Sequence, residues 1–218
     1  ENDIMDQEIE IINTNARNEK IKNFFIKNKN KLIIFIIIII LALASFFYFE
    51  DYKSKKKEDL STKYNQLIIT NDDVNKTNLQ IELKKIIEAK DKTYSPLAFY
   101  FLLDNDLITS KEEINKYFDI LIHEIGLDKE NKNLTTYKKA LYNSNFVDEN
   151  KLLSILNPVI QSKSMWKPHA LFLMAEFYYA KNQKQKSKEF FNKLINIEDA
   201  NSKVKLEAQK RLRSDFSE

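Results

Sequence analysis

Residues 32–49 read LIIFIIIIILALASFFYF, and the interpretation of the whole chain depends on this stretch. None of its 18 residues is charged, and 14 of them are Leu, Ile or Phe. A helix of this length spans about 27 Å, close to the roughly 30 Å hydrocarbon core of a bilayer, and these side chains favour insertion by about 4–8 kcal/mol. A buried strand of this length would be far outside the usual range. We therefore predict one membrane-spanning helix, Leu32 to Phe49.

A cleaved signal peptide is the main alternative to a permanent anchor. Ala42-Leu43-Ala44 has the small-x-small form of a cleavage site. However, 31 residues precede the stretch, whereas an entire signal peptide usually occupies about 15–30. Phe46 to Phe49 also prolong the apolar run and place aromatic rings at a membrane interface. The sequence begins with Glu1 rather than Met, and Met5 is a candidate for the natural start.

The charges on the two sides of the stretch leave its orientation open. Six basic residues precede it and five follow closely: Arg17, Lys20, Lys22, Lys27, Lys29 and Lys31, then Lys53, Lys55, Lys56, Lys57 and Lys63. The positive-inside rule barely separates these counts. A short tail that inserts as a hairpin would leave the large domain outside the cytoplasm, but charge alone does not decide between the two orientations.

Composition predicts helices for the rest of the chain. Only one of the 218 residues is Gly, three are Pro, and no Asn-Gly or Asp-Gly pair is present for a tight strand turn. We expect a tail over residues 1–31 and one helical domain over residues 50–218, which is long enough for its own core. The 35 basic and 32 acidic residues are interleaved, with a net charge of +3, so we expect no nucleic-acid partner. Without Cys there is no disulfide, thiolate zinc site or cysteine nucleophile.

Apolar spacing and capping residues locate the predicted helices. A helix continues from Glu50 to about Ile69, and Asn71-Asp72-Asp73 forms a turn. Ser95-Pro96 starts a helix with Pro at its first position, and Ser110 to Glu113 forms a capping box for a helix that ends at a C′ Gly126. The remaining predicted helices are Lys76–Lys90, Leu134–Tyr142, Glu149–Val159 with a perturbation at Pro158, Trp166–Ala180, Lys184–Ile195 and Ser202–Phe216.

Five residues near the C-terminus have the spacing of a tetratricopeptide repeat: Met174, Ala175, Tyr178, Ser187 and Phe191. Ala175 and Ser187 are small where two helices would cross, whereas Tyr178 and Phe191 would fill the space between successive hairpins. The predicted fold is therefore all-α, a single transmembrane helix followed by a tetratricopeptide-like stack of helical hairpins. The earlier hairpins share the architecture without this spacing.

The order of these parts resembles the tetratricopeptide-like ancillary subunits of the bacterial Sec translocon, and most of all their alphaproteobacterial members. Residues 15–25, NARNEKIKNFF, are similar to the segment before the family's membrane helix. Residues 164–170, SMWKPHA, through 205–211, KLEAQKR, resemble its C-terminal end. The likeness extends over nearly the full chain. The family's Gly-Asp turn in the last hairpin is Lys181-Asn182 here.

This resemblance implies an inner-membrane protein with a cytoplasmic N-terminal tail and a periplasmic C-terminal domain. It also implies a place beside the Sec translocon, a periplasmic chaperone as partner, and a role in handing on exported chains. A tetratricopeptide scaffold in envelope assembly or cell division is the alternative function. An enzyme with a divergent site is a third class.

Catalytic and ligand-binding patterns were weighed against plain structural roles. His123 and His169 have no second His at i+4, so we expect no metal site. A single Gly cannot form a Gly-rich phosphate loop, and we expect no cofactor and no small-molecule substrate. Residues 53–57 either contact anionic lipid through their lysines or form a solvated face with Glu58 and Asp59. Six aromatic residues either line a groove for unfolded chains or pack between hairpins, and we favour packing: Phe99, Tyr100, Phe101, Phe177, Tyr178 and Tyr179.

Overall fold

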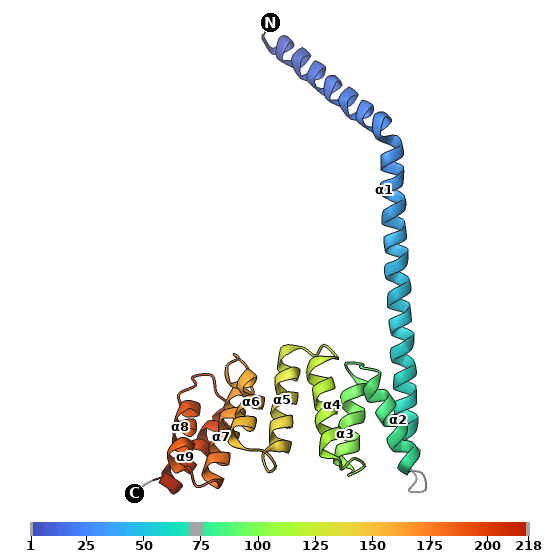
Figure 1. The fold of residues 1–218 in the computed structure, drawn as a ribbon. Coiled ribbons are helices and arrows are strands. Elements are labelled where there is room, and N and C mark those ends of the chain that lie inside the picture. The colour runs from blue at the N-terminus through green and yellow to red at the C-terminus, as the bar shows by residue number, and fades with distance from the viewer. Residues whose placement is uncertain (1, 70–75, 217–218) are drawn as a thin grey trace. The chain divides into compact units, whose positions relative to one another are not determined.

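The computed structural model describes residues 2–69 and 76–216, with side chains from residue 17 onward. These residues form nine helices and no strand, which confirms the all-α prediction (Figure 1). The helices are α1 Asn2–Ile69, α2 Lys76–Glu88, α3 Tyr94–Asp104, α4 Lys111–His123, α5 Lys129–Asn143, α6 Glu149–Ile160, α7 Lys167–Ala180, α8 Lys184–Ile195 and α9 Ser202–Phe216. The turn predicted at Asn71-Asp72-Asp73 lies outside the described residues.

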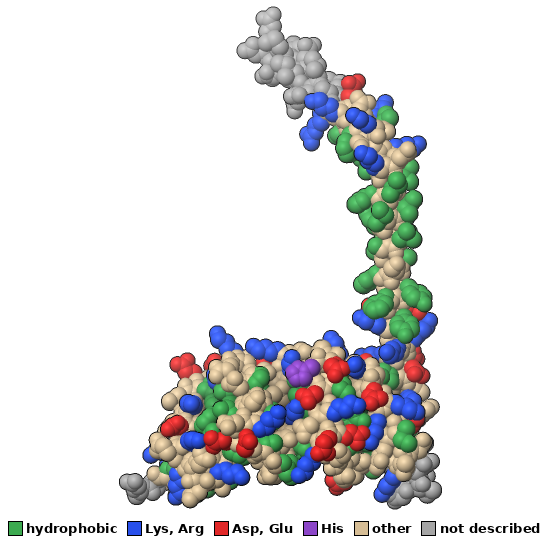
Figure 2. All heavy atoms as spheres, in the orientation of Figure 1, with side chains coloured by type: hydrophobic (Ala, Val, Ile, Leu, Met, Phe, Trp, Pro, Cys, Tyr) green, Lys and Arg blue, Asp and Glu red, His purple; other side chains and the backbone are tan. Residues whose placement is uncertain are grey.

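The chain divides into two compact units, Glu1–Asp59 and Leu60–Glu218. The first unit contains the apolar stretch, which lies within α1 and has the length and hydropathy needed to cross a membrane. None of its most apolar window is buried, and its green side chains stand free along the helix in Figure 2. A core helix of a soluble protein would be covered, whereas a membrane span or a signal sequence would not be.

The second unit repeats a pair of helices along the chain. Helices α3, α5, α7 and α9 begin at Tyr94, Lys129, Lys167 and Ser202, which are 35, 38 and 35 residues apart. Helices α2, α4, α6 and α8 begin at Lys76, Lys111, Glu149 and Lys184, with the same three intervals. These intervals are close to the 34-residue period typical of tetratricopeptide repeats. The repeating architecture therefore runs from α2 to α9, whereas the repeat spacing in the sequence marked only the hairpin of α7 and α8.

Polar contacts between neighbouring pairs have the same period. The Glu130 carboxylate accepts a hydrogen bond from Ser164 Oγ at 2.7 Å, 34 residues away. Glu149 accepts from Gln183 Nε2 at 3.0 Å, also across 34 residues. These two bonds, with the Lys186 ammonium, link the start of one helix to the turn one repeat later. The hydrogen bond from Gln183 and then that from Lys186 hold the pKa of Glu149 below its usual value.

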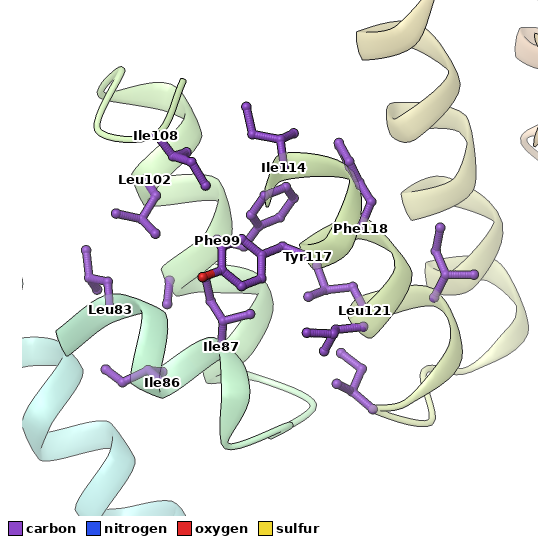
Figure 3. Close-up of a cluster of buried hydrophobic side chains, with 14 of the residues drawn as sticks. Leu83, Ile86, Ile87, Phe99, Leu102, Ile108, Ile114, Tyr117, Phe118 and Leu121 are labelled. Carbon is purple, nitrogen blue, oxygen red and sulfur yellow. The ribbon is translucent and has the colours of Figure 1, made fainter. Parts of the chain in front are cut away.

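The first core cluster joins the end of α1 to α2, α3 and α4 (Figure 3). Phe99 lies at its centre, with its ring centroid 4.8 Å from that of Phe118 and 6.0 Å from that of Tyr117. The stripe predicted on α2 faces this core: Leu79, Leu83, Ile86 and Ile87 are all buried. Leu60 from the last part of α1 belongs to the same cluster. The 3.6-residue period of the sequence thus fixes which side of α2 is covered.

Two predicted helix starts were wrong because a carboxylate that binds the first amides lies further upstream than the apolar pattern. Helix α3 begins at Tyr94 rather than at Ser95-Pro96, and the Asp91 carboxylate accepts from the backbone N–H groups of Thr93 and Tyr94 at 2.8 Å. Helix α5 begins at Lys129 rather than Leu134, because the side chain of Asp128 accepts from two N–H groups of the first turn. Each carboxylate satisfies amides that the helix itself leaves unpaired.

The predicted capping box at Ser110 is half formed. Ser110 Oγ accepts from the backbone N–H of Glu113 at 3.2 Å, as expected. The Glu113 carboxylate does not return the bond: it contacts the Lys84 ammonium at 2.6 Å and accepts from the Tyr117 hydroxyl at 2.9 Å. An ion pair between two helices therefore replaces the local bond, and it ties α4 to α2. Pro158 lies inside α6, which continues to Ile160.

Residues with a left-handed backbone conformation follow several helices, although the chain has almost no glycine. Lys90, Asp106 and Asn182 have φ of 58°, 53° and 58°, each just after a helix. Asn182 takes this conformation in the short turn between α7 and α8. Gly126, with φ of 63°, lies beyond the C-cap Glu124 of α4, so it is further from the helix than the predicted C′ position.

We expect Gly126→Ala to lower the free energy of unfolding of the helical unit by about 1–2 kcal/mol. A Cβ at this position would lie 3.5 Å from Lys92 Cε, an ordinary contact, so the cost is conformational rather than steric. Urea denaturation followed by circular dichroism measures it. Ala200→Gly, in the partly exposed turn before α9, is the control for changing one methyl group in a turn. An unchanged midpoint for Gly126→Ala would contradict the role of the left-handed turn.

Candidate protein-interaction groove

The five predicted repeat-packing residues come together where α7 meets α8. Met174, Ala175, Ser187 and Phe191 are fully buried, and Tyr178 is nearly so. Met174 and Tyr178 join a core with α5 and α6, whereas Ala175 and Phe191 join a core with α9. Helix α7 is therefore covered on more than one side, as its apolar sequence requires. We propose that these five residues set the packing of the last repeat.

A groove of about 450 Å³ lies on alternate helices of the stack. Its lining comes from α5, α7 and α9: Tyr137, His169, Phe172, Lys203, Val204 and Glu207. These helices occupy the same place in successive repeats, and α7 contacts both α5 and α9. The groove is thus a product of the repeat, because residues far apart in sequence reach one surface only when alternate helices adjoin.

Aromatic rings form one wall of the groove. Tyr137 and Trp166 are stacked, with ring centroids 6.0 Å apart and planes inclined by 22°. The His169 ring lies 5.1 Å from Trp166 and 5.9 Å from Tyr137. Nδ1 of His169 is buried and makes no hydrogen bond with the described residues. Burial also raises the pKa of Tyr137. The wall offers flat apolar area at small entropic cost, which suits the side chains of another polypeptide.

The opposite wall is held in place by an arginine. Arg211 of α9 donates two hydrogen bonds to the Glu176 carboxylate of α7, at 2.7 and 2.9 Å, and also pairs with Asp215. Its guanidinium lies 4.6 Å from the centroid of the Tyr179 ring. The hydrogen bond with Glu176 raises the pKa of Arg211, whose guanidinium is therefore always protonated at physiological pH. This bidentate contact fixes α9, and therefore Lys203 and Glu207, beside α7.

Two other hollows suit a partner less well. A larger one of about 710 Å³ is formed by residues of α2, α4 and the turns that follow them, among them four acidic residues and two lysines. Its two lysines are already paired: Lys90 lies 2.5 Å from Glu124 and Lys116 lies 3.6 Å from Glu88. A smaller one of about 340 Å³ is mostly polar, with Ser144, Asn145 and Glu176 in its lining. Apolar lining with few polar groups is the usual mark of a binding groove, and this favours the first.

The other residues considered in the sequence analysis differ in burial and in their contacts. Phe99, Phe177 and Tyr178 are buried and pack between helices, whereas Tyr100, Phe101 and Tyr179 are half-buried. None of the six lines the groove. His123 is exposed and lies 3.8 Å from Asp119. Within the described part of the chain, no three His, Asp or Glu side chains gather where they could hold a metal ion.

Sequence reasoning missed most of the groove. None of the lining residues was predicted to belong to a binding site, and His169 was expected to have a structural or surface role rather than to bind a metal. No short motif marks them, because they come from three helices. The spacing of the helix starts was the one available signal, since it shows which helices are alternate members of a stack.

The repeated helix pairs and the groove across alternate helices have the architecture of a tetratricopeptide-like helical repeat fold. In agreement, a family model described as a tetratricopeptide repeat-like domain matches residues 22–112. The matched residues include the apolar stretch, α2 and α3, and they end well before the hairpin of α7 and α8. Comparisons with curated proteins and with solved structures give no significant match.

Proposed function

We propose that this protein is a membrane-anchored, non-catalytic module that binds other proteins in protein export. In this proposal it is an ancillary factor of the Sec translocon and links the translocon to periplasmic chaperones and exported chains. The observation that carries the proposal is the pairing of an exposed apolar helix with a tetratricopeptide-like stack that has an aromatic groove. Tetratricopeptide-like domains typically bind proteins, and a tether raises their local concentration at the membrane.

The proposed membrane span is Leu32 to Phe49, in the bacterial inner membrane. The tail, residues 1–31, lies in the cytoplasm, and the helical domain lies in the periplasm. The resemblance of residues 15–25 and 164–211 to the translocon subunits supports this orientation. Digestion of spheroplasts with added protease tests it: we expect the domain to be degraded without lysis. Protection of the domain until the cells are lysed would reverse the orientation and remove the export role.

The proposed binding surface is the groove of α5, α7 and α9. An extended chain could place apolar side chains against Tyr137 and Phe172, and Lys203 and Glu207 at the rim could pair with either charge. Such a groove selects for exposed apolar segments rather than for one sequence, which suits newly exported, unfolded clients.

We expect the double variant Lys203→Glu, Val204→Ser to reduce the capture of partners by at least about tenfold, the effect of losing one apolar anchor and inverting one rim charge. Affinity purification of the full-length protein from membranes, with quantitative mass spectrometry, measures it. Lys188→Glu on the exposed part of α8 is the matched control for charge and should keep full capture.

Recovery of translocon and chaperone subunits by the unaltered protein supports the proposal. Recovery of only cytosolic proteins contradicts it. Recovery of division or envelope-assembly proteins, together with septal or polar location in cells, supports the scaffold function instead. Equal loss of capture in Lys188→Glu and in the groove variant would show that general charge, and not this groove, binds the partners.

A further inference from the structure

The segment just before the apolar stretch carries an exposed apolar face of its own. Ile21, Phe24 and Phe25 are 48%, 58% and 55% exposed. Their spacing of three and four residues places them side by side on one face of α1. The rings of Phe24 and Phe25 meet edge to face, with centroids 6.0 Å apart. Three large apolar side chains therefore form a continuous exposed patch that no described residue of the first unit covers.

Lysines flank this patch on both sides. At 100° per residue, Lys20, Lys27 and Lys31 lie along one edge of the patch, and Lys22 and Lys29 lie along the other. Residues 17–31 contain six basic side chains and one acid, Glu19, so their net charge is +5. An apolar stripe between two rows of lysine is the pattern of helices that bind at a membrane interface.

The segment after the apolar stretch differs from this segment in its net charge. Residues 50–59 contain four lysines and four acids, so their net charge is zero. Lys55 lies 2.8 Å from Asp51. Counts of basic residues alone make the two flanks look alike, but among the residues nearest the apolar stretch, 17–31 and 50–59, acids neutralise only the second group. The charge at the membrane surface is therefore concentrated on the N-terminal flank.

A side-chain hydrogen bond marks the point where the segment meets the apolar stretch. Asn28 Nδ2 donates to the backbone carbonyl of Phe24 at 2.9 Å. A side chain that competes for an i−4 carbonyl weakens the helical ladder and favours bending there. Such a bend lets the apolar patch turn toward the surface while residues 32–49 stay across the bilayer.

We propose that residues 17–31 form an interfacial helix that binds anionic phospholipid on the N-terminal side of the membrane. Ile21, Phe24 and Phe25 enter the region between head groups and acyl chains, and the flanking lysines pair with lipid phosphates. Five acidic residues lie at positions 1–10, before the part of the chain whose side chains the structure describes. The proposal rests on the membrane anchor proposed above.

The absence of Cys allows a direct test with the full-length chain. A single Asn18→Cys, beside Ile21 on the same face, carries an environment-sensitive fluorophore. The protein is placed in vesicles of phosphatidylcholine alone, or with about 30% phosphatidylglycerol. Each lysine near an anionic surface contributes roughly a fivefold preference. We therefore expect insertion of the label to rise at least about tenfold in the anionic vesicles and to fall at high salt.

Two lysine variants separate the flanks. Replacement of Lys20, Lys22, Lys27, Lys29 and Lys31 by Gln should abolish the response to phosphatidylglycerol. Replacement of Lys53, Lys55, Lys56 and Lys57 by Gln removes nearly as many charges and should leave the response unchanged. A double change of Phe24 and Phe25 to Ser should also reduce insertion of the label, because the charge remains but the apolar patch is lost.

Flotation of the same vesicles distinguishes the two proposals. A protein that floats with vesicles, but whose label ignores phosphatidylglycerol, overturns the interfacial helix and leaves the anchor intact. A protein that does not float with either kind of vesicle overturns both. Equal loss of response in the two lysine variants also overturns the assignment to residues 17–31.

Discussion

Phe99→Ala is expected to lower the free energy of unfolding of the helical unit by about 3–5 kcal/mol, the range for removing a buried aromatic ring. The side chain is fully buried, and its ring contacts those of Phe118, Tyr117 and Tyr100 within the first core cluster. Removing it leaves a cavity at the joint of α2, α3 and α4 (Figure 3). Domains of this kind are stable by only about 5–15 kcal/mol, so the loss takes a large share of the total.

Urea unfolding of the full-length chain in non-ionic detergent, with hydrogen exchange to locate the change, measures this loss. Leu97→Ala on the same helix is the matched control, because Leu97 is 44% exposed. We expect the control to cost less than about 1 kcal/mol. Similar costs for the two variants would contradict the central position of Phe99 in the core.

Ala175→Leu is expected to destabilise the last repeat by about 1–3 kcal/mol or more, because the larger side chain overfills a closely packed contact. Ala175 is fully buried in the core that α7 shares with α8 and α9. Repeats contact only their neighbours, so the loss should be local. Hydrogen exchange should rise in α8 and α9, while α2 and α3 keep their protection. Partner capture should also fall, because α9 forms one wall of the groove.

Ala180→Leu is the matched control for this variant. It makes the same substitution on the same helix, at an exposed position. We expect a change within about 0.5 kcal/mol. If Ala175→Leu were as mild as this control, Ala175 would not be a packing position of the repeat, and the proposed role of the five residues would need revision.

Particular residues illustrate how far sequence reasoning reached. Helices α8 and α9 begin and end at the predicted residues, because charged and apolar side chains alternate there with a clear helical period. The start of α5 was misplaced by five residues. Its first turn is polar, and only the carboxylate of Asp128 reveals where the helix begins. Periodicity finds the covered part of a helix, whereas a cap is a local bond that apolar spacing does not detect.

The sequence by itself determined the all-helical class, the exposed apolar helix and the buried faces, because each follows from the local order of apolar and polar side chains. Tertiary structure alone decided the groove and the links between repeats. Tyr137, His169 and Val204 lie on three different helices, and Glu176 meets Arg211 across 35 residues. Such neighbours arise from the way alternate helices stack, which depends on contacts between distant segments and is not written in any short stretch of the chain.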